Sequence, residues 1–188
     1  MEMNTILFIG KPGSGKGTQS ALLSEKTGFK AIASGDLFRA LIKEDTHVAE
    51  LMREEHEKGL LAPDWFATYL FQKSILNILP EEGIIFDGFG RKVTEARTVI
   101  DVLTWLKRPF TAVHIKVSDE EIVERLQKRS LVSGRADDLN VEKRLEEFRT
   151  HTEPSVEVFR EAGRLVEIDG MGTPEEITLA IQKALNLQ

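Results

Sequence analysis

A glycine-rich segment near the N-terminus constrains this chain more than any other feature. Residues 10–18 read GKPGSGKGT, directly after the apolar run 5–9 and directly before a helical pattern at 19–26. The glycines let backbone N–H groups point inward at an anion, and the N-terminus of the following helix adds the positive end of its dipole. A strand, such a loop and a helix in this order predict a phosphate-binding loop, or P-loop, within an α/β fold.

The individual positions of this loop predict how it holds phosphate. Lys16 brings a positive charge to the phosphate that would be transferred. The general motif has Ser or Thr directly after the lysine to coordinate Mg²⁺, but Gly17 occupies that place and Thr18 follows it. Direct coordination of a metal by the loop is therefore left open. The residues assigned to nucleotide phosphate binding are Gly13, Ser14, Gly15, Lys16, Gly17 and Thr18.

Short apolar runs alternate with amphipathic segments along the whole chain. This alternation predicts βαβ units and a parallel sheet of about five strands, with about eight helices around it. We expect every strand to be buried on both faces, as is usual in parallel sheets. The expected strands are 5–10, 29–33, 83–87, 110–117 and 164–169. Apolar residues at helical spacing share one face at 93, 96, 100, 103 and 106, and again at 145, 148, 152, 156 and 159.

The length of 188 residues predicts a single domain, 1–188, with two insertions near the ligand edge of the sheet. Residues 34–78 are expected to add two or three helices between the second and third strands. Residues 130–139 are expected to form a short polar loop. The aromatic side chains of Trp65, Phe66, Tyr69 and Phe71 are interpreted as core packing.

Composition excludes several classes of function. The net charge of −6 argues against binding to nucleic acid or to anionic membrane surfaces. The sequence contains no cysteine, which rules out disulfides, thiolate catalysis and cysteine-based zinc sites, and its four histidines are scattered. Neither a signal peptide nor a membrane-spanning run is evident. We therefore expect a cytoplasmic protein whose partners are small molecules.

Asp87 is the strongest candidate outside the P-loop. It ends the apolar run 84–86, which places its carboxylate at the carboxyl edge of a strand, facing the loop. There it can orient Mg²⁺ and the water bound to it. Arg125 and Arg129 share one helical face, where like charges repel and a bound anion would relieve the repulsion. Arg39 could reach a phosphate from the helix that follows the second strand, and Asp36 is expected to brace that helix.

Further segments resemble the adenylate kinase family over nearly the whole chain. The loop ends in GKGTQ, as is typical of that family, and the other segments follow in the same order with compatible spacing. They are IASGDLFR at 32–39, GLLAPD at 59–64, DGFGR at 87–91, GRADD at 134–138, Arg144-Leu145, and IDG at 168–170. The resemblance implies a P-loop kinase fold with a five-stranded parallel sheet flanked by helices, a helical monophosphate-binding insertion and a short lid without zinc.

The resemblance also implies a reaction. It is the reversible transfer of a phosphoryl group from Mg-ATP to a nucleoside monophosphate, most often AMP, so the expected cofactor is Mg²⁺ and the donor is ATP. By resemblance, Arg125 stacks on the donor adenine, and Asp137 and Asp138 hold the closed lid. The expected catalytic residues are Lys16, Arg91, Arg129, Arg135 and Arg144. Those expected to bind the acceptor are Ser34, Arg39, Gly88, Arg91, Glu95, Arg135 and Arg144.

Alternatives remain at this stage. The acceptor could be UMP, CMP or GMP, and a nucleotide-binding module without catalysis is the rival of another class. Ser34 favours AMP, because AMP-specific relatives carry Thr or Ser there. Glu95 stands where those relatives usually carry Gln, and an ionised carboxylate cannot donate to adenine N1. We expect AMP to remain the best acceptor with relaxed discrimination, unless Glu95 turns to solvent or pairs with Lys92.

Gly90 replaces a proline of the family. A non-proline cis peptide bond costs about 3–4 kcal/mol, so we expect a trans Phe89–Gly90 bond and an Arg91 that is held less firmly than in relatives. Gly90→Pro would on this basis tighten acceptor binding. A monomer is expected, because two insertions that move need free space around them.

Overall fold

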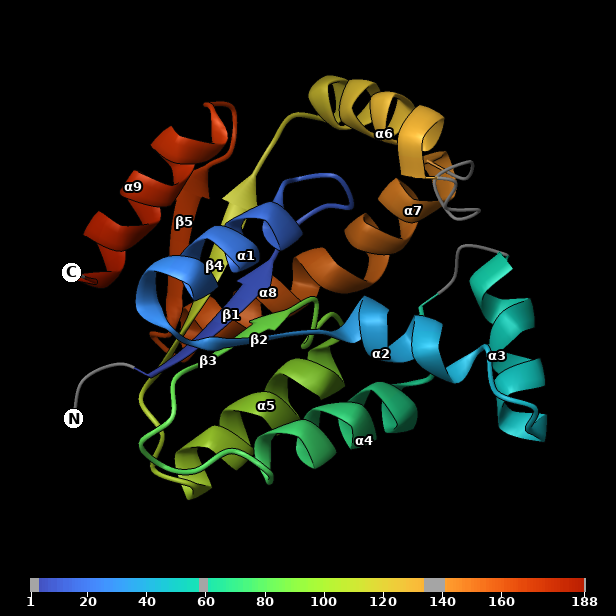
Figure 1. The fold of residues 1–188 in the computed structure, drawn as a ribbon, viewed down its shortest axis with the longest axis horizontal. Helices are drawn as coiled ribbons and strands as arrows, with labels where there is room; N and C mark the ends of the chain where they lie inside the picture. Colours follow the sequence, from blue (N-terminus) through green and yellow to red (C-terminus); the bar gives the residue numbers. More distant parts are fainter. Residues whose placement is uncertain (1–3, 58–60, 134–140, 188) are drawn as a thin grey trace.

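The computed structural model describes residues 4–57, 61–133 and 141–187. Its centre is a five-stranded parallel sheet in the order β2-β3-β1-β4-β5 (Figure 1). Every strand lies within one residue of its expected ends at either side. The strands are β1 (Thr5–Ile9), β2 (Lys30–Ala33), β3 (Ile84–Asp87), β4 (Phe110–Lys116) and β5 (Leu165–Asp169). The predicted α/β class and parallel sheet are confirmed.

The register of the central strands brings the P-loop and Asp87 together. In the pairing of β1 with β3, Phe8 lies opposite Asp87, and the P-loop starts two residues after Phe8. In the pairing of β2 with β3, Ala33 also lies opposite Asp87, so the helix that begins at Ser34 leaves from the same edge. Parallel strands present all their carboxyl ends at one edge, which is where ligands bind in open α/β sheets.

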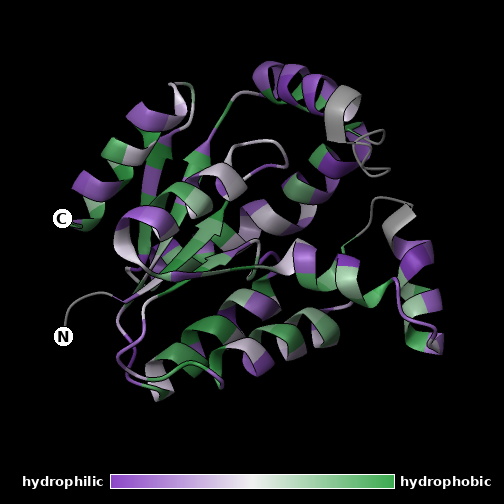
Figure 2. Cartoon of the chain, viewed as in Figure 1, coloured by the Kyte–Doolittle hydropathy of each residue, from purple (hydrophilic) through white to green (hydrophobic). Residues whose placement is uncertain are grey.

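Two layers of helices cover the sheet (Figure 1). On one face, α1 (Lys16–Thr27) packs beside α9 (Pro174–Leu185), and α6 (Asp119–Ser133) joins the same apolar core through Ile122 and Leu126. On the other face, α4 (Asp64–Ile75), α5 (Val93–Trp105) and α8 (Glu153–Glu161) enclose a second core. Figure 2 shows the hydrophobic strands between these layers and hydrophilic residues on the outer helix faces. No helix of the described ranges is both long and apolar enough to cross a membrane.

The expectation that all strands are buried on both faces is wrong for the two edge strands. The residues of β1 are fully buried, and Ile84, Ile85 and Phe86 of β3 have no exposed surface. In contrast, β2 begins with two exposed residues, and β5 buries Ile168 while leaving Glu167 and Asp169 exposed. The reason is the sheet order, because an edge strand has a neighbour on one side only. Helical cover over both faces is complete only above the central strands.

The predicted apolar face at 145–159 is confirmed in full. Leu145, Phe148, Thr152, Val156 and Phe159 are all buried, although they lie on three different helical segments. These segments are α7 (Val141–Glu147), the π-helix η2 (Phe148–Thr152) and α8. Such π-helical turns often occur at functional sites.

The segment 34–78 contains three helices, as predicted. They are α2 (Ser34–Leu41), α3 (His47–Glu57) and α4, of which α4 belongs to the core through Phe71 and Ile75. The interpretation of four aromatic residues as core packing is half wrong. Phe66 and Phe71 are buried, whereas Trp65 is 64% exposed and Tyr69 is 49% exposed, because they lie on the outer face of α4.

The predicted polar loop 130–139 begins later than expected. Residues 130–133 form the last turn of α6, since that helix ends at Ser133. Apolar residues on α6, Ile122 and Leu126, anchor it to the core, so the helical pattern continues to this point. The rest of the predicted loop, with Arg135, Asp137 and Asp138, lies outside the described residues.

Candidate functional site

One cavity at the carboxyl edge of the sheet brings together seven of the predicted site residues. The P-loop, the ends of β2 and β3, and the helices α4, α5 and α7 all contribute to its wall. The lining residues include Lys16, Ser34, Arg39, Gly88, Arg91, Glu95 and Arg144. These seven positions come from segments up to 128 residues apart in the chain, and the sheet brings them together.

Lys16 lies at the electrostatic centre of the cavity. It is the first residue of α1, with Gly15 at the N-cap, and its Nζ donates to the carbonyl oxygens of Gly10 at 2.8 Å and Lys11 at 2.7 Å. The pKa of Lys16 is lowered from 10.5 to about 7, chiefly by burial. The Asp87 carboxylate opposes this shift, and the positive charges of Arg91, Arg144 and Arg129 add to it.

This concentration of cations is the chemical character of the site. Besides burial, the positive charges of Arg91, Arg144 and Arg129 disfavour the protonated form of Lys16. Only one carboxylate, Asp87, is among the groups that act on this lysine in the described structure. A ligand carrying several negative charges removes the repulsion, as the phosphates of a nucleotide would.

Gly17 and Asp87 lie where a magnesium ion would bind next to the P-loop. A β-carbon added to Gly17 would lie 3.5 Å from Oδ2 of Asp87, so the carboxylate faces the position where the general motif has a hydroxyl. Gly17 leaves that space open, and Thr18 is exposed on α1. Mg²⁺ typically binds one or two carboxylates together with water and substrate phosphates. One carboxylate beside a phosphate loop fits an ion bound through water.

Gly88 directly follows β3 and contacts Ser34, which directly follows β2. It has a φ of +77°, and a β-carbon there would lie 2.5 Å from Nη2 of Arg91 and 2.9 Å from Oγ of Ser34. Ser34 Oγ donates to the Gly88 carbonyl at 2.8 Å. The positive φ favours glycine here, and a β-carbon would crowd the guanidinium of Arg91 in its present position. Ser34, Gly88 and Arg91 are therefore one packed unit in the cavity wall.

Arg39 reaches the same cavity from α2. Its Nη2 pairs with Asp36 at 2.5 Å, one helical turn earlier. Asp36 thus holds the guanidinium, which agrees with the expectation that Asp36 has a bracing role. The pair is largely accessible to solvent, with 31% of the Arg39 side chain exposed. Exchanging Asp36 for a phosphate would cost Arg39 little free energy, because an exposed ion pair contributes little to stability.

Glu95 is buried in the wall of the cavity, with 5% of its surface exposed. Its Oε2 accepts a hydrogen bond from the backbone N–H of Arg91 at 2.9 Å. Burial raises the pKa of the Glu95 carboxyl above 4.5, and the Arg91 hydrogen bond partly opposes that shift. Both alternatives in which Glu95 avoids the site are wrong, since it is not in solvent, and Lys92 pairs with Asp64 instead. Glu95 also fixes the backbone of Arg91, contrary to the expectation of a loosely held arginine.

The backbone at Gly90 explains why glycine replaces proline here. The described residues contain no cis peptide bond, so the predicted trans Phe89–Gly90 bond is confirmed. Gly90 itself has a φ of +71°, and a β-carbon there would lie 3.1 Å from the ring of Phe159. Proline is locked near −65° and cannot adopt this conformation.

The positive φ of Gly90 removes the basis for expecting Gly90→Pro to tighten acceptor binding. We now expect this variant to lose on the order of 3 kcal/mol of unfolding free energy, because the turn must rearrange. Urea denaturation of Gly90→Pro checks this, with Gly163→Ala as a control for positive φ in open space, since nothing lies within 4 Å of that position. A Gly90→Pro protein with the stability of the wild type would contradict the argument.

The other predicted arginines are placed as follows. Arg144 lines the cavity, and Arg129 lies close enough to act on the charge of Lys16. Arg125 is not among the residues that line this cavity; its Nε donates to Glu121 at 2.7 Å and its Nη2 donates to the Gly170 carbonyl at 2.9 Å. Glu121 thus offsets part of the positive charge on this helical face.

Sequence reasoning missed the floor of the cavity. Phe148 and Thr152 of η2 line it, together with Glu147 at the end of α7. The ring of His114 on β4 stacks against Phe148 with centroids 6.3 Å apart. The only signal for this floor was the apolar face at 145–159, which indicates a buried helix but not a ligand.

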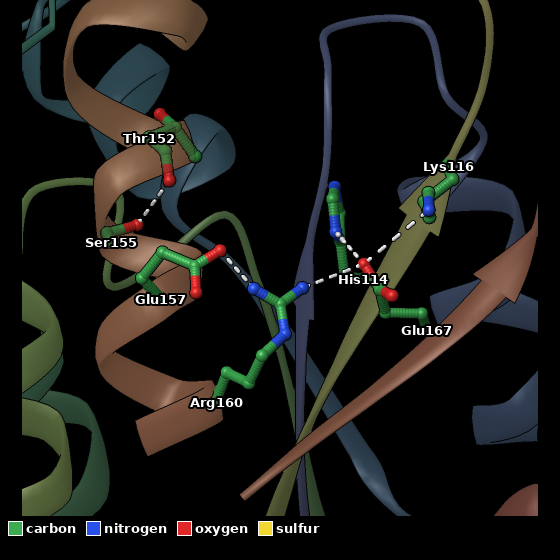
Figure 3. A network of polar contacts seen from close by, with 7 residues as sticks. All are labelled: His114, Lys116, Thr152, Ser155, Glu157, Arg160 and Glu167. Carbon is green, nitrogen blue, oxygen red and sulfur yellow. Dashed lines mark hydrogen bonds and ion pairs between the residues drawn. The ribbon is translucent and has the colours of Figure 1, made fainter. Parts of the chain in front are cut away.

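A polar network supports this floor from behind (Figure 3). Ser155 donates to the Thr152 carbonyl, while Arg160 on α8 contacts both Glu157 and Glu167. Glu167 on β5 also lies 3.4 Å from His114 Nδ1. Burial lowers the pKa of His114, which keeps the ring neutral and compatible with stacking on Phe148. These contacts join α8 to β5 and β4 next to the π-helix.

Comparison with known proteins agrees with this geometry. The family model for adenylate kinase matches residues 8–164. An adenylate kinase of Thermus thermophilus is 36% identical over 185 residues, covering 97% of each chain. Those of Parabacteroides distasonis and Porphyromonas gingivalis are 35% and 38% identical, covering 98% and 95% of this chain. The cationic cavity around a P-loop lysine and the similarity along almost the full length lead to one conclusion: the chain belongs to the adenylate kinase family.

Proposed function

We propose that this chain is an adenylate kinase that reversibly transfers the γ-phosphoryl group of Mg-ATP to AMP, giving two ADP. The observation that carries the proposal is the convergence of Lys16, Arg91 and Arg144 on one cavity, with Arg129 and Asp87 close enough to act on the charge of Lys16. An oxygen of the acceptor phosphate attacks the γ-phosphorus directly, and the bond from that phosphorus to the bridging oxygen of the β-phosphate breaks. Because no protein nucleophile takes part, catalysis consists of positioning and charge neutralisation.

The residues proposed to bind the donor and those proposed to bind the acceptor come from different elements of the fold. The P-loop amides of residues 13–18 and Lys16 hold the donor phosphates, and Arg39 and Arg91 hold the acceptor phosphate. Arg129 and Arg144 neutralise charge on the transferring group, with Arg135 as an expected further contact. Arg125, braced by Glu121 and Gly170, is proposed to stack on the donor adenine. Magnesium bound with ATP would neutralise charge on the phosphates, and Asp87 would hold it through water.

Base selectivity is proposed to depend on Glu95. Its Oε2 is engaged by the Arg91 N–H, which leaves the second carboxylate oxygen to meet a ligand in the cavity. When ionised, that oxygen accepts from the amino group of adenine but opposes the lone pair on N1. Guanine offers N1–H and an amino group as donors. We therefore expect AMP to be the best acceptor, with measurable turnover of GMP.

The test is a coupled assay of ADP formation with ATP against AMP, GMP, CMP and UMP. Glu95→Gln keeps an acceptor for the Arg91 N–H and adds a donor toward the base. We expect it to raise the ratio of kcat/KM for AMP to that for GMP by about 5-fold or more, since a buried hydrogen bond is worth about 1–3 kcal/mol. Glu161→Gln, on the exposed face of α8, is the matched control.

The same assay has a pH dependence with a definite sign. Because burial raises the pKa of Glu95, its carboxyl takes up a proton at higher pH than an exposed glutamate. The protonated form donates as glutamine does, so the preference of the wild type for AMP should increase as the pH falls. Glu95→Gln should show no such change. A wild type that turns over no base but adenine, with a ratio unchanged in Glu95→Gln, would show that Glu95 does not read the base.

We also propose that the enzyme acts as a monomer in the cytoplasm on small-molecule nucleotides. The two insertions at the ligand edge of the sheet need free space around them, which favours a monomer. A sequence without cysteine and with a net charge of −6 is compatible with a reducing compartment and with partners other than nucleic acid.

A further inference from the structure

Lys92 links two walls of the cavity, although it is not itself one of the lining residues. One wall consists of Leu61, Ala62 and the first turns of α4, and the other carries Gly88, Arg91 and Glu95. Lys92 is the N-cap residue of α5 and follows Arg91 directly. Its Nζ crosses to the first wall, where it pairs with Asp64 at 2.7 Å and donates to the Ala62 carbonyl at 3.2 Å.

A second residue of α5 supports the same contact. The hydroxyl of Thr94 donates to the other carboxylate oxygen of Asp64. Both oxygens of Asp64 are thus bound by residues of the β3–α5 junction, and the pKa of Asp64 is lowered chiefly by its hydrogen bonds to Lys92 and Thr94. Asp64 is also the first residue of α4, where a carboxylate interacts favourably with the helix dipole. The start of α4 is therefore tied to the loop that carries Arg91.

Residues 61–64, called the strap below, make a longer contact on the side that faces α7. The Leu61 N–H lies 3.4 Å from Oε2 of Glu147 on α7, at the outer limit of a hydrogen bond. Of the described contacts that link this strap to other elements, those made by Lys92 and Thr94 are the shorter ones. Only 20% of the Lys92 side chain is exposed, so its pairing with Asp64 is partly shielded from water.

From this arrangement we infer that Lys92 is a positioning residue for the acceptor site, holding the Leu61–Asp64 strap at a fixed distance from Arg91 and Glu95. The inference rests on the proposed function, because it assigns the cavity between these two walls to the acceptor nucleotide. Lys92 does not line the cavity, so it acts through its contacts with Asp64 and Ala62 and through its charge, which opposes the raised pKa of the Glu95 carboxyl. A pocket whose walls are already joined binds its ligand without having to order them first.

The consequence is a selective loss of acceptor affinity when the link is broken. Lys92→Met keeps the length and the apolar part of the side chain but removes the charge and both contacts. We expect its KM for AMP to rise about 5-fold, as for the loss of a charge-assisted contact of about 1 kcal/mol. The KM for ATP and the kcat should stay within about 2-fold of the wild type, because the P-loop and Lys16 are unaffected.

Three further variants separate positioning from a general loss of stability. Lys92→Arg retains the charge and a donor and should restore most of the affinity for AMP. Lys73→Met, which removes an exposed lysine above the ring of Tyr69 on the outer face of α4, is the matched control. Asp64→Asn should raise the KM for AMP by itself. The double variant with Lys92→Met should then be no worse than the more affected single variant, as expected for two residues that act through one contact.

The outcomes distinguish this inference from the proposed function. A wild type that fails to phosphorylate AMP would overturn the proposed function and with it the role of Lys92. If the wild type phosphorylates AMP but Lys92→Met keeps the wild-type KM for AMP, only the role of Lys92 is overturned. The same holds if the KM values for AMP and ATP rise together, or if Lys92→Arg is as impaired as Lys92→Met, because either result would indicate a structural role alone.

Discussion

Lys16→Met is expected to lower phosphoryl transfer by at least about 10²- to 10³-fold while the folded state becomes no less stable. The loss of activity follows from the position of Lys16 at the centre of the cationic cavity. The effect on stability follows from its pKa, which the fold lowers from 10.5 to about 7. Holding this charge in a buried, positively charged site is unfavourable by an amount on the order of 5 kcal/mol when the pH is below 7.

The pH dependence of this cost gives a second measurement. Between pH 7 and about 10.5, the unfolded chain binds the lysine proton more tightly than the folded chain does. The contribution of Lys16 to stability therefore rises with pH through this window and is lost as the pH falls through it. In urea denaturation of the nucleotide-free proteins, the advantage of Lys16→Met over the wild type should be larger at pH 7 than at pH 9.

Lys26→Met is a suitable control, since that lysine lies in the last turn of the same helix, where its amine contacts Gln182 on the surface. If Lys16→Met lost several kcal/mol of unfolding free energy together with its activity, the lysine would be a structural anchor for the Gly10 and Lys11 carbonyls. A pH-independent difference between variant and wild type would show that Lys16 is not strained.

Arg144→Ala is expected to reduce turnover by roughly 10³-fold, with a change in unfolding free energy below about 1 kcal/mol. Arg144 projects from α7 into the cavity, and its charge acts on Lys16. An arginine that neutralises charge on the transferring phosphoryl group acts in the transition state more than in the bound substrate. The kcat should therefore fall far more than the KM values rise. Arg129→Ala should behave in the same way, because its charge also acts on Lys16.

The neighbouring cation on the same helix provides the control for this prediction. Lys143 pairs with Glu146 at 2.8 Å and has 42% of its side chain exposed, so Lys143→Ala should retain full turnover. Steady-state kinetics and thermal unfolding of Arg144→Ala, Arg129→Ala and Lys143→Ala test this prediction. Should Arg144→Ala keep more than a tenth of the turnover, or lose it only in proportion to its folded content, the assignment of Arg144 to the transferring group would be wrong.

Local sequence patterns predicted the P-loop and its place at the carboxyl edge of the sheet. The P-loop is contiguous, and its function depends on backbone amides and one lysine that short-range sequence order already specifies. Asp87 could be placed beside it because an apolar run that ends in a carboxylate puts that group at the carboxyl edge of the sheet. The central strands were predictable because a strand buried between two helical layers is a continuous apolar run.

The acceptor side of the site could not be derived in this way. The sequence determined that a carboxylate stands at 95, but only the tertiary structure decided that it is buried and bound to the Arg91 N–H. Equally, Gly90 suggested a loosened loop, whereas its positive φ beside Phe159 shows a turn that proline cannot form. The wall built by Lys92 and Asp64 joins two segments that are 28 residues apart, with no local pattern to mark the pair. Burial, charge repulsion and backbone conformation depend on neighbours that come together only when the chain folds, and for that reason the structure had to supply them.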